Sequence, residues 1–322
     1  MNQLATYTAF VEQQMAAHAF PNTPENLYDP LRYFLKIGGK RMRPILTLMA
    51  AEAVSVSPNE SIAAALSVEL FHNFSLIHDD IMDDAPVRRG FQTVHEKWNP
   101  NIAILSGDVL LVESYKQLSY YTDDRLPLLF KRFNDTAVEV CEGQQMDMDF
   151  EERANVSVDE YIEMIRLKTS VLLGCALEFG VIVGRGDEQL RKLFYDFGVQ
   201  LGLAFQIQDD YLDLYADPDK FGKQVGGDVL ANKKTMLSLL ARDICIKTQD
   251  TRYQELLKMS AGPEKVTFAQ NLFQELNVVD HVLAEMNVHF DKAMQDLEKM
   301  NLSETAKTPF KELADFLINR EH

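Results

Sequence analysis

The chain has 322 residues, of which 46% are hydrophobic and 25% are charged, a composition typical of a globular protein and not of a disordered one. Asp and Glu number 49 against 32 Lys and Arg, which gives a formal net charge of −17. This charge argues against nucleic-acid binding and against attachment to a membrane surface through a basic patch.

The three cysteines, Cys141, Cys175 and Cys245, lie far apart among apolar residues and fit no metal-binding spacing. We expect reduced thiols in the core of a cytoplasmic protein. No basic-then-apolar leader follows Met1, so no secretion signal is expected. The most apolar stretch, residues 171–183, contains an acid and is too short for a transmembrane segment.

Apolar residues recur at helical spacing along nearly the whole chain, as in the stripe Leu66, Leu70, Phe74, Ile77 and Ile81. No convincing alternating run with hairpin residues is present. We therefore expect an all-α protein of roughly a dozen helices, in a single domain over residues 1–322. Proline and glycine predict helix ends at Pro21-Asn22, Gly38-Gly39, Ser57-Pro58, Ala85-Pro86, Gly184-Arg185-Gly186, Asp217-Pro218 and Gly262-Pro263.

The first segment with candidate chemistry is Gly38-Gly39-Lys40-Arg41-Met42-Arg43-Pro44. A glycine pair followed by Lys40 and Arg43 at the start of a helix can bind an anion through charge and free backbone N–H groups. An ordinary helix cap with solvated basic side chains explains the same pattern about equally well.

A helix ending near Pro86 carries four acids, Asp79, Asp80, Asp83 and Asp84. Acids four residues apart repel each other on one helix face, and the negative end of the helix dipole disfavours them further. Taken alone, such a cluster is usually a solvated helix end. Its apolar flanks favour partial burial instead, and a buried charge needs a partner.

A similar cluster, Asp209, Asp210 and Asp213, lies near the end of a later helix, with Gln206 on the same face. Gly202, one turn earlier, would allow another helix or a ligand to approach closely. Two clusters of carboxylates suggest Mg²⁺, which also binds phosphate oxygens. Neither cluster has the spacing of a Ca²⁺-binding loop.

Several basic or polar residues accompany these acids in the sequence. His72 precedes the first cluster by two turns and Arg88-Arg89 follow it, while Lys223 and Lys233 follow the second cluster. Lys168-Thr169 lies on an apolar helix, where a lone lysine usually extends its amine to solvent. Together these residues describe a site for a substrate with a diphosphate head and an apolar tail.

The two acid motifs, in this order with Gly-Gly-Lys-x-x-Arg-Pro, make the chain resemble the trans-isoprenyl diphosphate synthases, or polyprenyl synthetases. The resemblance covers nearly the whole length and implies the isoprenoid synthase fold, with the acid motifs facing a central cavity. It implies Mg²⁺ binding by Asp79, Asp80, Asp83, Asp84, Asp209, Asp210 and Asp213, and catalytic roles for Asp79, Asp83, Asp209, Lys168 and Arg88. It also implies isopentenyl diphosphate binding by Lys40, Arg43, His72 and Arg89, and allylic diphosphate binding by Arg88, Lys168, Thr169, Gln206, Lys223 and Lys233, with Gln144 and Asp147 in a further polar motif.

The implied reaction is a prenyl transfer assisted by about three Mg²⁺ ions, in which pyrophosphate leaves the allylic substrate and isopentenyl diphosphate attacks the cation. A homodimer is also implied. Phe74 lies five residues before Asp79, about 7.5 Å of helix rise, and with Ser75 and Phe71 is the candidate floor that limits the product to farnesyl or geranylgeranyl diphosphate. Simple core packing explains Phe74 as well.

Several alternative functions stay open at this point. They are a longer-chain synthase, a class I terpene cyclase, a metal-dependent phosphohydrolase using the His78-Asp79 pair, and a non-catalytic partner subunit. Lys40, Arg43 and His72 argue against the cyclase, which has less use for a second diphosphate site. The absence of further spaced histidines argues against the phosphohydrolase, and the intact acid motifs argue against a non-catalytic subunit.

Overall fold

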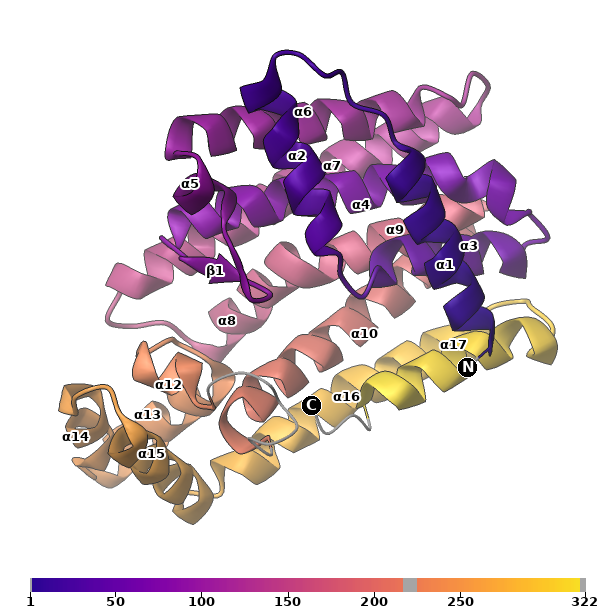
Figure 1. Ribbon diagram of the computed structural model, residues 1–322. Coiled ribbons are helices and arrows are strands. Elements are labelled where there is room, and N and C mark those ends of the chain that lie inside the picture. Colours follow the sequence, from indigo (N-terminus) through magenta and orange to yellow (C-terminus); the bar gives the residue numbers. More distant parts are fainter. Residues whose placement is uncertain (1, 217–224, 319–322) are drawn as a thin grey trace. The chain divides into compact units, whose positions relative to one another are not determined.

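The computed structural model describes residues 2–216 and 225–318, and the regular secondary structure of these residues is helical apart from one pair of two-residue strands (Figure 1). The all-α prediction is therefore confirmed for this part of the chain. The chain divides into two compact units, Met1–Thr136 with Cys175–Tyr195 (unit 1) and Ala137–Gly174 with Asp196–His322 (unit 2). None of the described helices combines the length and the apolar character that crossing a membrane requires.

The first half of the chain forms several helices, and those before Pro86 begin and end near the predicted glycine and proline signals. They are α1 (Asn2–Ala17), α2 (Glu25–Ile37), α3 (Met42–Ala53), α4 (Pro58–Met82), α5 (Val94–Lys97), α6 (Pro100–Leu118) and α7 (Arg125–Glu152). Gly38, just after α2, has φ of +76°, a left-handed conformation that glycine adopts without strain. Pro58 opens α4 in the first turn, where a missing N–H does no harm.

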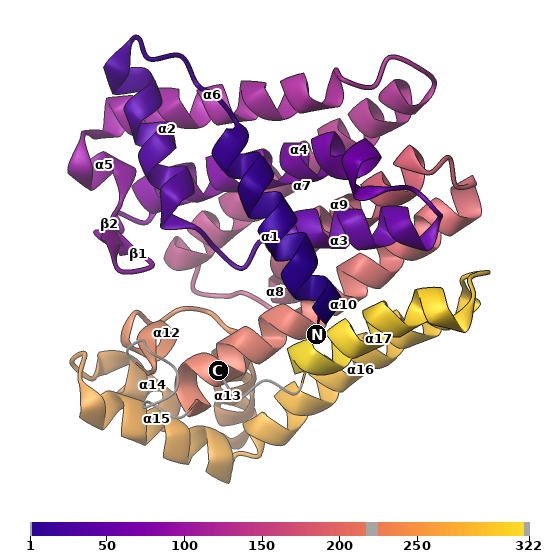
Figure 2. The same cartoon turned by 45° about the vertical axis from the view of Figure 1, so that its right-hand side comes forward.

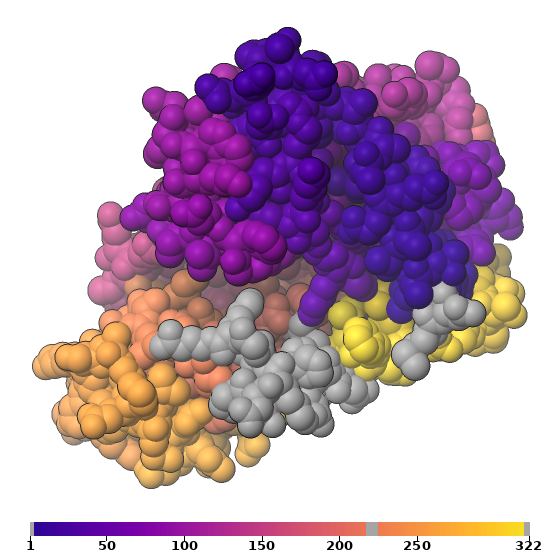
Figure 3. Space-filling model, viewed as in Figure 1, coloured from indigo at the N-terminus to yellow at the C-terminus, as the bar shows by residue number. Residues whose placement is uncertain are grey.

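The core of unit 1 forms around α4, which packs against α3 and α6. Leu66, Leu70 and Ile77 of the predicted stripe are buried, whereas Phe74 and Ile81 are half-buried. Helix α1 packs against α3 and α4, and α2 packs against α6; both are indigo in Figure 3.

The expectation that no hairpin occurs is wrong at one place. β1 (Val87–Arg88) pairs antiparallel with β2 (Phe91–Gln92), and Arg89 and Gly90 form the connecting turn with φ of +53° and +80°. Two successive positive φ values are those of the turn that suits a two-residue hairpin. Strands of two residues are too short to produce an alternating sequence pattern, so sequence reasoning missed them.

Unit 2 contains most of the remaining helices. The elements after α7 are α8 (Val158–Ile165), the π-turn η1 (Arg166–Ser170), α9 (Val171–Val183), α10 (Glu188–Tyr215), α12 (Gly227–Leu230), α13 (Met236–Thr248), α14 (Arg252–Lys258), α15 (Pro263–Glu275), α16 (Val278–Lys299) and α17 (Glu304–Ile318). Figure 2 shows α16 and α17 side by side, in contact along the chain's end. The helix end predicted at Asp217-Pro218 lies outside the described residues.

The three cysteines are free thiols, and Cys175 and Cys245 are buried as expected. Cys141 is exposed, so its predicted place in the core is wrong. It lies on the exposed side of α7 together with Glu142, whereas Val140 and Gly143 on either side of this pair are buried.

Candidate functional site

The acidic end of α4 receives a cation from the β1–β2 hairpin. Met82 is the last helical residue and Asp83 caps the helix, which confirms the predicted end before Pro86. Arg88 of β1 donates from Nε to Asp80 Oδ1 at 2.7 Å and from Nη2 to Asp79 Oδ2 at 3.2 Å. One guanidinium thus offsets the charge of two carboxylates at the negative end of the helix dipole.

Asp80 is the buried member of this first acid cluster. It is 1% exposed, and burial raises its pKa although Arg88 opposes the shift. Its second oxygen, Oδ2, has no hydrogen-bond partner among the described residues. Asp79 is half-buried, and Asp83 and Asp84 are exposed. Mg²⁺ is a hard cation that prefers oxygen ligands, and a bound ion would give the buried Oδ2 of Asp80 a partner. The first acid cluster therefore fits Mg²⁺.

The predicted diphosphate-binding residues of unit 1 include a group of mutually repelling cations. Arg43 Nη1 lies 3.1 Å from His72 Nε2, and Arg89 donates to the carbonyl oxygen of Gly38. Burial lowers the pKa of Arg43 to about 10, with Arg89 adding to the shift. Burial, followed by Arg43 and Arg89, lowers the pKa of His72 well below its usual value, so His72 is neutral and can accept from Arg43. A bound anion would relieve this repulsion. Lys40 is exposed.

Arg41 is a neighbouring residue that the sequence did not single out. Its Nε donates to Glu12 Oε1 at 2.8 Å and its Nη1 to Glu69 Oε1 at 2.6 Å, and its side chain is only 1% exposed. Arg41 therefore fixes the turn before α3. Nothing in the local sequence separates it from Lys40 and Arg43, because both of its partners come from distant helices.

His78 forms its contacts away from the first acid cluster. Its Nε2 lies 3.1 Å from the carbonyl oxygen of Ile104, and a Cβ added at Gly107 would lie only 2.3 Å from that nitrogen. The glycine thus leaves room for the imidazole ring against α6. This local contact removes the basis for a phosphohydrolase that uses a His78-Asp79 pair.

The proposed chain-length residues belong to an aromatic cluster in unit 1. The ring centroid of Phe74 lies 5.5 Å from that of Phe71 and 4.7 Å from that of His78. Phe71 is 1% exposed and also contacts Phe133 at 5.3 Å. Ser75 is half-buried, and its hydroxyl donates to the carbonyl oxygen of His72. Phe74 therefore has a packing role whether or not it also limits the product.

In unit 2, a chain of hydrogen bonds orients Asp210 of the second acid cluster. Asp210 accepts from the hydroxyl of Tyr161 and from Gln206 Nε2 at 3.1 Å, and Gln206 Oε1 accepts from Thr169 Oγ1 at 3.4 Å. Burial, strengthened by Asp228, raises the pKa of Asp210. Tyr161 was not predicted, because it lies in a short helix with no recognisable motif.

Lys168 and Thr169 lie in the π-turn η1, and single π-turns frequently occur at functional sites. Lys168 Nζ lies 2.6 Å from Asp147 Oδ2, so these two predicted polar residues form an ion pair. A Cβ at Gly143 of α7 would lie 2.3 Å from Lys168 N, and one at Gly202 of α10 would lie 2.8 Å from the Cα of Ser170. The π-turn is held between two glycines, which confirms the close approach predicted for Gly202.

Asp213 and Asp228 form the second part of the unit 2 site. Asp213 Oδ2 accepts from the backbone N of Asp228 at 3.0 Å, and its carbonyl oxygen accepts from Gly226 N. Burial, followed by the charge of Asp213, raises the pKa of Asp228. Asp228 was not predicted, although the Gly226-Gly227 pair directly before this acid was an available signal.

These side chains border a cavity of about 350 Å³ within unit 2. The predicted residues that line it are Asp147, Lys168, Thr169, Gln206, Asp210 and Lys233, and Tyr161 and Asp228 join them. Asp209 is half-buried on α10. Lys223 lies outside the described residues. A divalent cation would stabilise the charged forms of Asp210 and Asp228, the buried acids whose pKa values are raised. The carboxylates of this cavity therefore also fit Mg²⁺.

Comparisons with known proteins show which family the chain resembles over most of its length. Residues 24–276 match the family model described as polyprenyl synthetase. The chain is 36% identical over 324 residues to a short chain isoprenyl diphosphate synthase of Methanothermobacter thermautotrophicus, covering 100% of this chain and 99% of the relative. It is 36% identical to a geranylgeranyl pyrophosphate synthase of Geoglobus acetivorans, covering 93% and 92%. A crystal structure of a geranylgeranyl pyrophosphate synthase superposes with a TM-score of 0.93 at 41% identity, covering 100% of both chains.

Proposed function

Because the chain belongs to the polyprenyl synthetase family and is a prenyltransferase, we propose that it joins isopentenyl diphosphate to an allylic diphosphate and releases pyrophosphate. The observation that carries this proposal is the combination of two acid clusters with separate groups of cations. One group is Arg43 and Arg89 beside neutral His72, and the other is Lys168 with Lys233 at the unit 2 cavity. Two diphosphate substrates require two such groups, whereas a cyclase would require one.

The residues named above act mainly by orienting and neutralising the diphosphates. Mg²⁺ bound to the acids would polarise the allylic diphosphate as a Lewis acid. Arg88 and Lys168 would stabilise the charge that develops on the leaving pyrophosphate as the allylic C–O bond breaks. The double bond of isopentenyl diphosphate then forms the new C–C bond, and the proton lost from its C2 passes to the released pyrophosphate.

The direct test is to incubate the purified protein with Mg²⁺, isopentenyl diphosphate and each allylic primer in turn, and to measure product length by chromatography. Asp79→Ala and Asp209→Ala should each lower kcat at least about 1,000-fold, since each removes a ligand of charge-stabilising metal. Asp135→Ala is the matched control, because Asp135 forms an exposed pair with Lys131 on α7. Turnover without isopentenyl diphosphate, or full activity of Asp79→Ala, would contradict the proposal.

We further propose that the product is geranylgeranyl or farnesyl diphosphate and that Phe74 limits its length. Phe74→Ala removes a ring that packs against Phe71 and His78, which opens space five residues before Asp79. The product should then lengthen by at least one isoprene unit. Val138→Ala, which truncates an exposed side chain on α7, should leave the product unchanged. A folded, active Phe74→Ala enzyme with the same product would refute this assignment.

The resemblance also supports a homodimer acting in the cytoplasm. Light scattering of the purified protein at micromolar concentration would test the dimer. A monomer that is fully active at that concentration would contradict it.

A further inference from the structure

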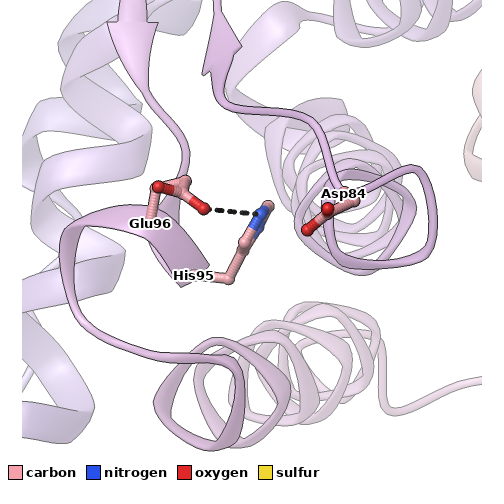
Figure 4. Close-up of side chains that lie close together, drawn as sticks. All are labelled: Asp84, His95 and Glu96. Carbon is pink, nitrogen blue, oxygen red and sulfur yellow. Dashed lines mark ion pairs between the residues drawn. The ribbon is translucent and has the colours of Figure 1, made fainter.

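Three side chains with the chemistry of transition-metal ligands meet beyond the end of α4. One ligand atom each from Asp84, His95 and Glu96 lies within 4.8 Å of the others, and His95 Nε2 lies 3.9 Å from Glu96 Oε1. Figure 4 shows the imidazole ring between the two carboxylates. All three residues belong to unit 1. His95 and Glu96 have no part in the function proposed above.

The backbone brings these residues together through bonds that do not involve their side chains. Asp84 follows α4 with φ of +48°, and the chain returns through the β1–β2 hairpin to α5. Thr93, directly before α5, donates from its N to Pro86 O at 3.2 Å and from Oγ1 to Ala85 O at 2.7 Å. The three candidate ligands are therefore held near one another before any ion binds.

His95 is the observation that points to a ligand. It is 7% exposed, and neither ring nitrogen has a hydrogen-bond partner among the described residues. The distance of 3.9 Å to Glu96 is too long for a hydrogen bond. Buried polar atoms are normally paired, and an exception calls for an explanation such as a bound ion. An imidazole lone pair facing two carboxylates is satisfied by a cation placed between them.

The donor set identifies the class of cation. Imidazole nitrogen favours Zn²⁺ and related transition metals, whereas Mg²⁺ prefers oxygen ligands throughout. Bonds of about 2.1 Å place neighbouring ligand atoms of a tetrahedral site about 3.4 Å apart. Asp84 and Glu96 are both exposed, so rotation of their side chains can close the remaining distance. Two carboxylates and a neutral imidazole would balance the charge of one Zn²⁺ ion.

We propose that Asp84, His95 and Glu96 bind a divalent transition metal of the Zn²⁺ class, with water completing the coordination. The ion joins the two ends of the segment that carries Arg88 and Arg89. It therefore stabilises the β1–β2 hairpin in the position that the Thr93 hydrogen bonds define. This site shares Asp84 with the first acid cluster, and the imidazole of His95 distinguishes its ligands and its metal from those of the all-oxygen clusters.

The test uses the full chain after treatment with a chelator. Zn²⁺ binding is measured by calorimetry in excess Mg²⁺, and Co²⁺ serves as a probe whose visible absorption reports nitrogen and oxygen coordination. Glu96→Gln and His95→Gln should each weaken binding by about tenfold or more. Zn²⁺ should raise the melting temperature of the unaltered protein and not that of Glu96→Gln. Because Glu96 is exposed, this variant should fold even if His95→Gln does not.

His281→Gln is the matched control, since His281 is an exposed histidine on α16. It should bind Zn²⁺ as the unaltered protein does. Equal affinity of Glu96→Gln and the unaltered protein would overturn the proposal, as would loss of Zn²⁺ to an excess of Mg²⁺. No binding at all would also overturn it. None of these readouts depends on turnover, so the proposed prenyl transfer can fail or succeed independently.

Discussion

Gly143→Ala probes the contact between α7 and the π-turn that carries Lys168. The new Cβ would lie 2.3 Å from Lys168 N, 2.7 Å from Lys168 Cα and 2.8 Å from the carbonyl carbon of Leu167. All three are backbone atoms, and ordinary contacts begin at 3.4 Å, so the two backbones must separate by about an ångström. A rotation of a side chain cannot relieve this clash.

The expected energetic effect combines two opposing contributions. Overpacking of this kind costs about 1–3 kcal/mol, while alanine is the better helix former by about 1 kcal/mol. We expect a net loss of stability of about 0–2 kcal/mol, which leaves the protein folded. Activity should fall much further, because the turn that carries Lys168 would move away from α7 and from Asp147, whose Oδ2 lies 2.6 Å from Lys168 Nζ. A displacement of about 1 Å in a catalytic group can lower the rate by about 100-fold.

The assay pairs thermal unfolding with steady-state kinetics on isopentenyl diphosphate and the preferred allylic primer. Gly262→Ala is the control, because a Cβ there meets no atom within 4 Å and the φ of 170° is open to any residue. It should keep the activity of the unaltered protein. Gly143→Ala with a rate within about threefold of that protein would refute the reasoning that the π-turn positions Lys168.

Two further predictions concern stability. Burial raises the pKa of Tyr121 to about 12, so the unfolded chain loses this proton above pH 10 while the folded protein keeps it. Stability should therefore fall with rising pH by about 1.4 kcal/mol per unit between pH 10 and 12. Tyr121→Phe should reduce that slope in urea titrations, whereas Tyr120→Phe, at a 74% exposed ring, should not; equal slopes in both variants would exclude the assignment. Glu178→Ala should lower the free energy of unfolding by about 3–5 kcal/mol, because it leaves the partly buried guanidinium of Arg132 without its carboxylate partner. Lys131→Ala, which changes a 76% exposed side chain, should lower it by less than about 0.5 kcal/mol.

The helix boundaries were predictable because they depend on local chemistry. Pro58 opens α4, Gly38 follows α2, and Pro263 opens α15, each at a position where backbone geometry restricts the residue type. The acid clusters were predictable for a similar reason, since carboxylates four residues apart are unfavourable unless a cation compensates. Arg88 supplies that compensation at Asp79 and Asp80.

The remaining features depend on contacts between distant segments. Tyr161 and Asp228 join Asp210 from segments 49 and 18 residues away in sequence. Tyr161 carries no pattern of its own, and the glycine pair before Asp228 does not indicate that this acid lies near Asp210. In the sequence, Arg41 resembles the other basic residues before α3. Only the structure shows that its guanidinium is buried and bonded to Glu69. His95 is an ordinary histidine in the sequence, and it draws attention only because it is buried and its ring has no hydrogen-bond partner in the described part of the chain.

The two acid clusters also differ in how the protein compensates them. In the first, Arg88 already neutralises part of the charge, and burial alone accounts for most of the raised pKa of Asp80. In the second, the charge of Asp228 adds to the raised pKa of Asp210, and the charge of Asp213 adds to the raised pKa of Asp228, which Lys233 opposes only in part. The hydrogen-bond partners of Asp210 are the neutral groups of Tyr161 and Gln206. Because neutral donors do not offset charge, the second cluster gains more from each cation that it binds. Metal should therefore stabilise unit 2 more than unit 1, so addition of Mg²⁺ should slow hydrogen exchange in α10 more than in α4.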